Sequence, residues 1–377
     1  MLELRQYVMV VLTPVHIGTG VSIGPEEYFL DGDCFVRFST AHVFGLMSDG
    51  ERGRYEQLMN GSDFQAGVKL VREVAKRHQT ECARYQVPVG LACKTRLEVL
   101  SAQRDNAVQT MPHAGDQDQV VVPGTAIKGA IRTALLSEWL QTKPDLVART
   151  ERQVWSSPGQ KLFVNSRDLE SEIIGVPKNR MEADPFRFLT VRDARIPASK
   201  MRVDQFQMGG RDGKPKSVTA VGGGISIYGE RLISLADRLG KNQAAVGVVE
   251  IGLDEGRQRD AGVDRVQQGA IKLRWTDVEK MTRAFYSQRL AEEMDRFPTL
   301  YEWLKPDQLK LAMENGLLLR IGRHSHFEAA SLDGVRRGWQ IMPRPGKAIA
   351  MGSTRTVCRL QDGSKSAAMG WVWLCPQ

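Results

Sequence analysis

The order of the regular segments is the feature that most constrains the fold of this chain. Short apolar runs that end at Gly, Pro or Thr predict strands, and longer stretches with apolar residues three or four positions apart predict helices. The expected strands span 4–12, 186–191, 217–228, 246–253 and 317–321, and the expected helices begin at Thr125 and Thr276. Without the long insertions, the order is strand, helix, two strands, helix, strand. This order is typical of ferredoxin-like or RRM-like domains, so we expect an α+β fold with large insertions and a C-terminal extension.

Three segments fall outside this order. Residues 51–86 are polar and helical in pattern, and residues 101–119 lack an apolar period, which is typical of an exposed loop. Residues 204–217 are rich in Gly, Lys and Gln, so we expect a projecting loop there. The expected divisions are a core over residues 1–260, an insertion at about 40–119, and a C-terminal part over 261–377 with a helix, a Gly-containing loop and closing strands.

Cysteine usage and hydropathy exclude several protein classes. The chain has five cysteines, and no two are spaced as Cys-x-x-Cys. An odd number without this spacing argues against a disulfide framework or a zinc ribbon and fits a reducing cytoplasm. No apolar run reaches the length of about 18 residues that a membrane span needs. The N-terminal stretch MLELRQYVMVVLTP lacks the layout of a signal peptide. We therefore expect a cytoplasmic protein.

The positive charge of the chain is concentrated near its end. The net charge is +8, and the segment 316–360 holds eight Lys and Arg residues against two carboxylates, Glu328 and Asp333. The basic residues are Arg320, Arg323, Arg336, Arg337, Arg344, Lys347, Arg355 and Arg359. A concentrated basic segment favours a polyanionic partner, and RNA or DNA is commoner than anionic lipid. A solvated basic face would give the same pattern.

The stretch VVPGTAIKGAIRTALL predicts a short extended segment followed by a helix. Thr125 is expected as the N-cap, with Gly124 providing the turn before it. Lys128 and Arg132 lie one helical turn apart, beside the apolar face. A helix start with free N–H groups and two cations suits an extended phosphate backbone. An ordinary capped helix with two solvated bases would have the same sequence.

Gly129 lies inside this helix. The apolar face consists of Ile127, Ile131, Leu135 and Trp139. A glycine in the helix interior costs about 1 kcal/mol relative to alanine. Such a glycine is tolerated best where another backbone comes close.

Several motifs for nucleotides, metals and catalysis are incomplete. Gly18-Thr19-Gly20 follows a strand, but Pro25 stands where a dinucleotide-binding helix would begin. The helix start has no Gly-Lys-Ser/Thr of a Walker A loop, and the chain has no GxSxG nucleophile motif. His324-Ser325-His326 resembles a pair of metal ligands, yet the other histidines form no second cluster. We expect no metal and no cofactor.

Four motifs follow one another along the chain. They are TPVHIGTG, VPGTAIKGAIRTALL, DPFRFLTVRDA and LRIGRHSHFEAASL, and a closing GWVWL comes after them. Together they resemble the RAMP superfamily, whose members are RNA-binding subunits of CRISPR effector complexes. The late loop is most similar to that of the subunit which caps the 3′ end of the guide RNA in the type III-A Csm complex.

The resemblance implies an RRM-like core with a projecting thumb near 197–218. It also implies that the helix start binds guide phosphates and that the two Gly-containing loops lie beside it. The residues implied as RNA-binding are His16, Gly18, Gly124, Thr125, Lys128, Arg132, Arg192, Lys214, Lys216, Arg320, Arg323 and His324. The glycines would let the backbone approach RNA closely, because no Cβ intrudes. Phosphate contacts of this kind position a protein, and guide–target pairing reads the sequence.

The implied partners are the 3′ part of a CRISPR RNA, target RNA and the other RAMP backbone subunits, with no membrane. Capping would end the filament of backbone subunits and support guide maturation and antiviral defence. Two alternatives stay open. One is a metal-independent endoribonuclease for CRISPR repeat RNA, with His16 or His324 as general base on a 2′-hydroxyl. The other is a different RAMP subunit of a type III complex. The capping subunit is generally regarded as non-catalytic, so we expect no enzyme.

Overall fold

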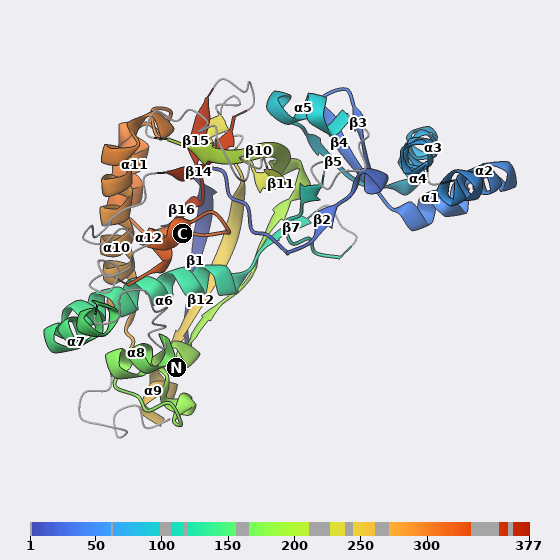
Figure 1. The fold of residues 1–377 in the computed structure, drawn as a ribbon. Helices are drawn as coiled ribbons and strands as arrows, with labels where there is room; N and C mark the ends of the chain where they lie inside the picture. Colours follow the sequence, from blue (N-terminus) through green and yellow to red (C-terminus); the bar gives the residue numbers. More distant parts are fainter. Residues whose placement is uncertain are drawn as a thin grey trace.

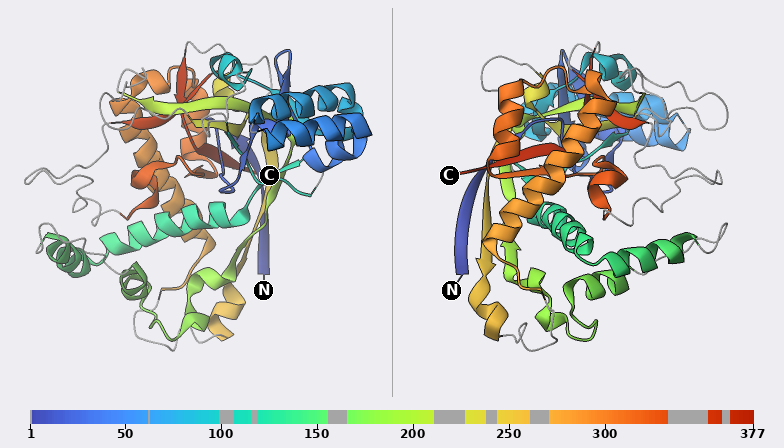
Figure 2. Two further views of the ribbon diagram at one scale, coloured as in Figure 1. Left: turned by 45° about the vertical axis from the view of Figure 1, so that its right-hand side comes forward. Right: turned by 90° about the vertical axis from the view of Figure 1, so that its left-hand side faces the viewer.

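A five-stranded antiparallel sheet forms the centre of the molecule (Figure 1). The structure is a computed structural model that describes residues 2–61, 63–98, 107–115, 119–155, 166–210, 227–237, 244–260, 271–332, 354–360 and 365–377. The strand order is β13-β16-β1-β12-β8. The strands are β1 (Leu2–Val11), β8 (Leu189–Val191), β12 (Val246–Asp254), β13 (Leu317–Arg320) and β16 (Trp371–Pro376). Helices α6 (Gly124–Gln141) and α10 (Trp275–Arg296) pack against each other and against this sheet (Figure 2).

Four of these strands confirm the expected ferredoxin-like order. β16, β1, β12 and β8 are neighbours in the sheet, with α6 following β1 and α10 following β12 in the chain. The sequence pattern placed residues 317–321 in the fourth position, but β16 lies beside β1 and β13 lies at the edge. The stretch WVWL suits a strand that is paired on both sides, because such strands are apolar throughout. The central sheet therefore contains strands from both sides of the domain boundary that was expected after residue 260.

A six-stranded sheet packs beside the central one, in the order β15-β14-β10-β11-β6-β2. Its strands are β2 (Ser22–Ile23), β6 (Val108–Gln109), β10 (Met201–Gly209), β11 (Ile227–Leu232), β14 (Arg355–Arg359) and β15 (Ser366–Ala368). Residues 204–209, expected in a projecting loop, are a strand because β10 pairs with both β11 and β14. Lys214 and Lys216, and with them most of the expected thumb loop, lie outside the described residues.

A separate arm projects from the body at the right of Figure 1. Its sheet contains β3 (Tyr28–Asp31), β4 (Cys34–Phe38) and β5 (Ala83–Pro88), and its helices are α1 (Thr40–Leu46), α2 (Asp49–Asn60), α3 (Phe64–Arg77) and α4 (Gln79–Cys82). The arm has a hydrophobic core of its own, which includes Phe29, Phe38 and Val74. The elements of the arm run from residue 28 to residue 88 and overlap the expected insertion at about 40–119. Val108, expected in an exposed loop, is fully buried in β6.

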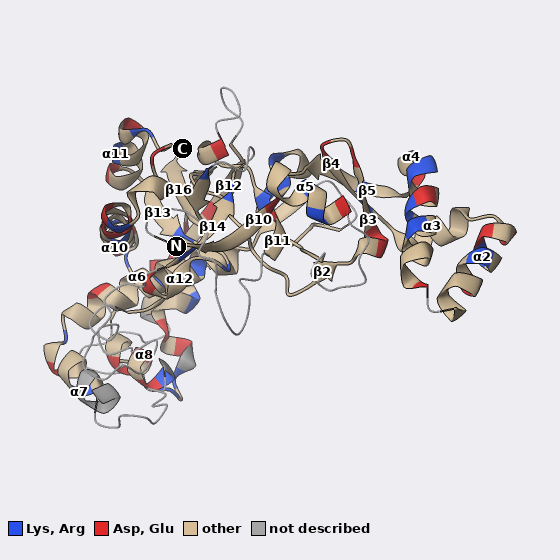
Figure 3. Cartoon of the chain, turned by 45° about the horizontal axis from the view of Figure 1, so that its top comes forward, with Lys and Arg blue, Asp and Glu red and all other residues tan. Residues whose placement is uncertain are grey.

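The remaining elements surround these sheets. They are α5 (Leu91–Glu98), β7 (Gln119–Val122), α7 (Pro144–Trp155), α8 (Ser166–Ile174), β9 (Ala194–Pro197), α9 (Glu255–Asp260), α11 (Pro306–Glu314) and α12 (His326–Ala330). Charged side chains are spread over the helices of the arm and of the body (Figure 3). Within the described ranges, no helix combines the length and the apolarity needed to cross a bilayer.

Candidate nucleic-acid interface

Three segments that are far apart in the sequence line one groove on the body. They are residues 17–20 after β1, residues 126–133 of α6, and residues 320–330, which include α12. The groove has a volume of about 630 Å³. We call it the α6 groove. The structure thus brings together three of the four motifs that the sequence singled out.

Tyr286 of α10 holds two walls of the α6 groove together. Its hydroxyl lies 3.1 Å from the carbonyl oxygen of Ala130 on α6 and 3.3 Å from that of Ala329 on α12. The side chain is fully buried, and burial raises the pKa of its hydroxyl to well above the usual value. The hydroxyl therefore stays a neutral donor. This role could not be predicted from the sequence, because Tyr286 fits the apolar pattern of its helix.

Two glycines leave the α6 groove open. No heavy atom of the described residues lies within 4 Å of the position that a Cβ would take at Gly20 or Gly129. Gly20 has a φ of +84°, a conformation that favours glycine. Gly129 lies within α6, where glycine destabilises the helix relative to alanine. No contact inside the described protein requires a glycine at this position. The space above both glycines is therefore available to a ligand.

Other glycines of these motifs serve packing within the protein. A Cβ on Gly124 would lie 2.1 Å from the carbonyl oxygen of Val191. A Cβ on Gly322, whose φ is +93°, would lie 2.5 Å from the carbonyl oxygen of His16. A Cβ on Gly18 would lie 3.2 Å from Nε2 of His16. Packing within the protein is therefore sufficient to explain the glycines at Gly124 and Gly322.

The start of α6 is closed by a carboxylate. The helix begins at Gly124, its N-cap is Pro123, and no side chain of the cap residue takes part. The backbone N–H of Gly124 donates to Oδ1 of Asp193 over 2.7 Å. The expected N-cap role of Thr125 is therefore wrong, and this side chain is exposed. Asp193 was visible in the DPFRFLTVRDA motif, but its contact with α6 depends on the tertiary fold.

Lys128 and Arg132 lie on the opposite flank of α6 from the groove. Arg132 pairs with Glu170 at 2.6 Å and with Asp184 at 3.3 Å, and its guanidinium lies 4.4 Å from the ring centroid of Phe186. Burial and the neighbouring Arg132 lower the pKa of Lys128, and Asp184 opposes this shift. The structure therefore does not bring these two cations together with the Gly-containing loops.

Part of the basic excess is neutralised inside the protein. Arg320 is 3% exposed, and its guanidinium pairs with Glu293 and lies over the ring of Trp371. Arg355 is also buried and pairs with Glu293 and Glu328. The charge of Arg320 is thus used within the fold, although the residue lines the α6 groove. Two of the basic residues counted in the segment 316–360 therefore add little to the surface charge.

Arg192 and Arg323 remain exposed. Arg192 is 74% exposed and pairs with Glu250 at 2.9 Å, away from the α6 groove. Arg323 lines the groove, and its Nη1 donates to Oε1 of Gln109 over 3.0 Å. Its backbone N–H donates to the carbonyl oxygen of His16, which fixes the late loop on the early one. Among the described residues that line the groove, Arg323 is the one exposed cation.

His16 and His324 stack beneath the groove. Their ring centroids are 5.8 Å apart, and each ring also contacts Phe206. Nδ1 of His16 lies 2.7 Å from the carbonyl oxygen of Glu230, and Nε2 of each histidine is buried and has no hydrogen-bond partner among the described residues. Burial lowers the pKa of His16. Burial, with His16 and Arg323 adding to the effect, lowers the pKa of His324 to about 4. Both rings are therefore neutral near pH 7.

His326 does not join His324 as a second metal ligand. Its Nε2 accepts a hydrogen bond from the backbone N–H of Thr356 over 2.9 Å, so its lone pair is used. The residue has a φ of +61°, which is unusual for a side chain other than glycine. The hydrogen bond from Thr356 holds the ring against β14. No group of three or more His, Cys, Asp or Glu residues in the described part of the chain could hold a metal ion.

Comparisons with known proteins place this geometry in context. A family model described as the RAMP superfamily matches residues 8–216. No curated protein sequence matches the chain. The crystal structure of T. onnurineus Csm5 is similar over 97% of this chain and 100% of its own, with a TM-score of 0.59 and 18% identity. A chain in the cryo-EM structure of a Csm–crRNA–target RNA ternary complex of a type III-A CRISPR–Cas system is similar over 98% and 100%, with a TM-score of 0.58 and 17% identity.

Proposed function

This chain belongs to the RAMP superfamily, and from that premise we propose that it is a CRISPR RNA-binding subunit of a type III-A Csm complex. Similarity to T. onnurineus Csm5 over nearly the whole length of both chains is the observation that carries this proposal. We further propose that it caps the 3′ end of the guide and ends the backbone filament. In this role it supports guide maturation and antiviral defence.

The α6 groove is the proposed path of the RNA. Its open glycines, Gly20 and Gly129, let a sugar–phosphate chain lie directly on the main chain. Arg323 supplies a fixed positive charge beside them, and Thr133 and Ser325 supply hydroxyl groups. Contacts of this kind hold a backbone without reading bases. Guide and target pairing then carries the sequence information, as it does in other RNA-guided effectors.

The proposed partners are the 3′ part of a CRISPR RNA, target RNA and neighbouring RAMP subunits in a prokaryotic cytoplasm. The cryo-EM neighbour belongs to a complex of Csm subunits with crRNA and target RNA, which supports this proposal. A subunit at the end of a filament has one neighbour instead of two. The arm with α1–α4 adds a module with a core of its own to the RAMP body.

We also propose that the chain does not cleave RNA itself. His16 is 1% exposed and lies under Gly18, so a 2′-hydroxyl does not reach its Nε2 without movement of the loop. Incubation of the purified chain with labelled repeat RNA in EDTA tests this point. Salt-sensitive binding without cleavage is expected. Cleavage that is lost in a His16→Ala or His324→Ala variant would instead establish the endoribonuclease alternative.

A matched pair of glycine substitutions tests the RNA path. Gly129 is exposed and Gly53 is partly exposed, both lie in helices, and at neither would a Cβ meet a described atom outside its own helix within 4 Å. Gly129→Leu fills the α6 groove, and Gly53→Leu changes α2 in the arm. Each variant is assembled into the complex, and the guide RNA is quantified and sequenced.

Gly129→Leu is expected to reduce the guide content about tenfold and to make the 3′ ends heterogeneous. Gly53→Leu is expected to match the unmodified complex in both respects. A full-length complex with normal guide content and uniform 3′ ends in the Gly129→Leu variant would overturn the proposed path. Circular dichroism of the isolated variants confirms that both are folded, since leucine favours a helix over glycine.

A further inference from the structure

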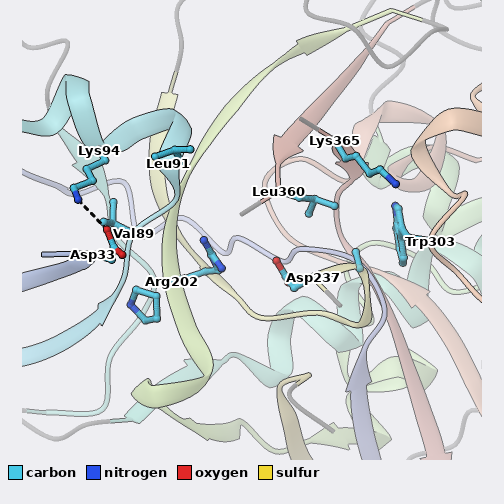
Figure 4. Close-up of a pocket in the computed structure, with 11 residues that line it drawn as sticks. Asp33, Val89, Leu91, Lys94, Arg202, Asp237, Trp303, Leu360 and Lys365 are labelled. Carbon is cyan, nitrogen blue, oxygen red and sulfur yellow. Dashed lines mark hydrogen bonds and ion pairs between the residues drawn. The ribbon is translucent and has the colours of Figure 1, made fainter. Parts of the chain in front are cut away.

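A second cavity lies between the base of the arm and the body, away from the α6 groove (Figure 4). It has a volume of about 560 Å³. We call it the junction pocket and define it by Asp33, Leu91 and Lys94 on the arm side and by Asp237, Trp303 and Lys365 on the body side. None of these residues lines the groove proposed for RNA.

The carboxylates of the junction pocket already have cationic partners. Asp33 pairs with Lys94 at 2.8 Å, a contact drawn in Figure 4. Asp237 accepts two hydrogen bonds of 2.6 Å from Arg231, and the backbone N–H of Ser234 adds a third over 2.8 Å. No carboxylate at the pocket therefore needs a positively charged ligand.

Two donors at the pocket have no acceptor among the described residues. Trp303 is 6% exposed, and no described atom accepts a hydrogen bond from its buried Nε1. Lys365 makes no ion pair with any described residue. In Figure 4 its ammonium group points toward the indole nitrogen of Trp303. A buried N–H without an acceptor is costly, and a negatively charged oxygen between these two groups would satisfy both.

Apart from Arg202, whose guanidinium pairs with Asp204, the rest of the wall is apolar. Leu91 is 64% exposed, the largest exposed fraction among the large hydrophobic residues of the described chain. It faces the pocket together with Val89, Leu360 and the ring of Trp303. A flat ring laid on this wall would remove apolar surface from water. A volume of about 300–1,000 Å³ is typical of pockets for small organic molecules.

We propose that the junction pocket binds a small organic anion that carries a flat ring, of the size of a nucleoside monophosphate. The phosphate lies between Nε1 of Trp303 and Nζ of Lys365, and the ring packs against Leu360, which lies beside them in Figure 4. This site and its ligand do not depend on RNA binding in the α6 groove.

Titration of the purified chain with the four ribonucleoside 5′-monophosphates tests the proposal, with isothermal calorimetry and tryptophan fluorescence as readouts. Saturable binding is expected for at least one nucleotide. The matching neutral nucleoside and inorganic phosphate alone are expected to bind at least tenfold more weakly. Lys365→Ala and Trp303→Phe are each expected to weaken nucleotide binding at least tenfold.

The controls are Lys69→Ala, an exposed lysine on α3, and Trp275→Phe. Trp275 also has a buried Nε1 without a partner but lies outside the pocket. Both control variants should bind the nucleotide as the unmodified chain does. Lys365 is exposed, so its replacement does not threaten folding if Trp303→Phe proves unstable. The absence of saturable binding, equal affinity for the neutral nucleoside, or unchanged affinity in Lys365→Ala would each overturn the proposal.

Discussion

The carboxylate of Asp193 accepts a hydrogen bond from the backbone N–H of Gly124 over 2.7 Å, and so it occupies the N-terminus of α6. A helix start attracts anions because its first N–H groups are free and its dipole is positive there. Here a protein carboxylate already holds this place. A phosphate at the same position would meet a negative charge. The RNA contact proposed for α6 therefore lies along the side of the helix, over Gly129, and not at its tip.

Asp193→Ala should lower the free energy of unfolding by about 1 kcal/mol, because the first amide of α6 loses its capping acceptor. Asp193→Asn keeps an oxygen acceptor and should lose less. Urea denaturation followed by circular dichroism measures both values. Glu56→Ala, an exposed change in α2, is the control and should be close to neutral. Equal stability of Asp193→Ala and the unmodified chain would show that the cap contributes nothing.

Gly124→Ala and Gly129→Ala should change stability in opposite directions. The new Cβ at Gly124 meets the carbonyl oxygen of Val191, so the backbone must shift and about 2 kcal/mol or more is lost. The new Cβ at Gly129 meets no described atom, and alanine stabilises a helix by about 1 kcal/mol relative to glycine. Thermal and urea unfolding of the two variants measure the difference. If Gly129→Ala were less stable than the unmodified chain, the new Cβ would have to meet atoms in the α6 groove other than those of the described residues.

Arg323→Ala should weaken RNA binding and make it less dependent on salt. Each phosphate contact that is lost reduces the slope of log K against log salt by about 1. Fluorescence anisotropy with a labelled guide RNA over a series of salt concentrations measures the slope. Lys69→Ala on the arm serves as the control. An unchanged slope in Arg323→Ala would remove this residue from the RNA surface.

Arg132→Ala should affect folding more than RNA binding. The substitution leaves Glu170 and Asp184 without their partner and should lower the free energy of unfolding by about 1 kcal/mol. The folded variant should lose less RNA affinity than Arg323→Ala, because the side chain lies on the far flank of α6. A larger loss of affinity than in Arg323→Ala would restore the sequence-based prediction that Lys128 and Arg132 bind guide phosphates.

Acid should destabilise the folded chain through the stacked histidines. The pKa of His324 is about 4 in the folded state, against 6.5 as its ordinary value. Between these two values the unfolded chain binds a proton that the folded chain does not, so stability falls as the pH falls from about 6.5 to 4. His324→Gln should flatten this dependence in urea denaturation at a series of pH values. His42→Gln, an exposed change on α1, should leave it as it is.

The ferredoxin-like core was predictable because its elements are long and strongly patterned. Ile127, Ile131 and Leu135 are fully buried, as the spacing along α6 predicted. Gly32 has a φ of +57° between β3 and β4, and the local sequence Asp31-Gly32-Asp33 is typical of such a hairpin turn. The convergence of the two Gly-containing loops on α6 followed from the family resemblance, and the geometry of the α6 groove agrees with it.

The other features of the fold and of the site depend on tertiary contacts within the chain, which no local sequence pattern reveals. Phe206 lay in a segment whose glycines and lysines predicted a loop, but pairing with Cys358 of β14 and Ile227 of β11 makes it a strand residue. The charges of Arg320 and Arg355 could be counted from the sequence, but not their burial beside Glu293. The closing strand of the sheet was misplaced, because residues 317–321 and the GWVWL stretch are equally apolar. Only the pairing register separates them.

The position of β16 between β1 and β13 also bears on how the molecule is made. β1 leaves the ribosome early, and its partner β16 follows only after most of the chain has been translated. At about 5–20 residues per second, the edge of β1 waits for roughly 20 to 70 s. During that time its backbone is an open template for wrong pairing. Until the last strand closes the sheet, the nascent chain is therefore exposed to aggregation through this edge.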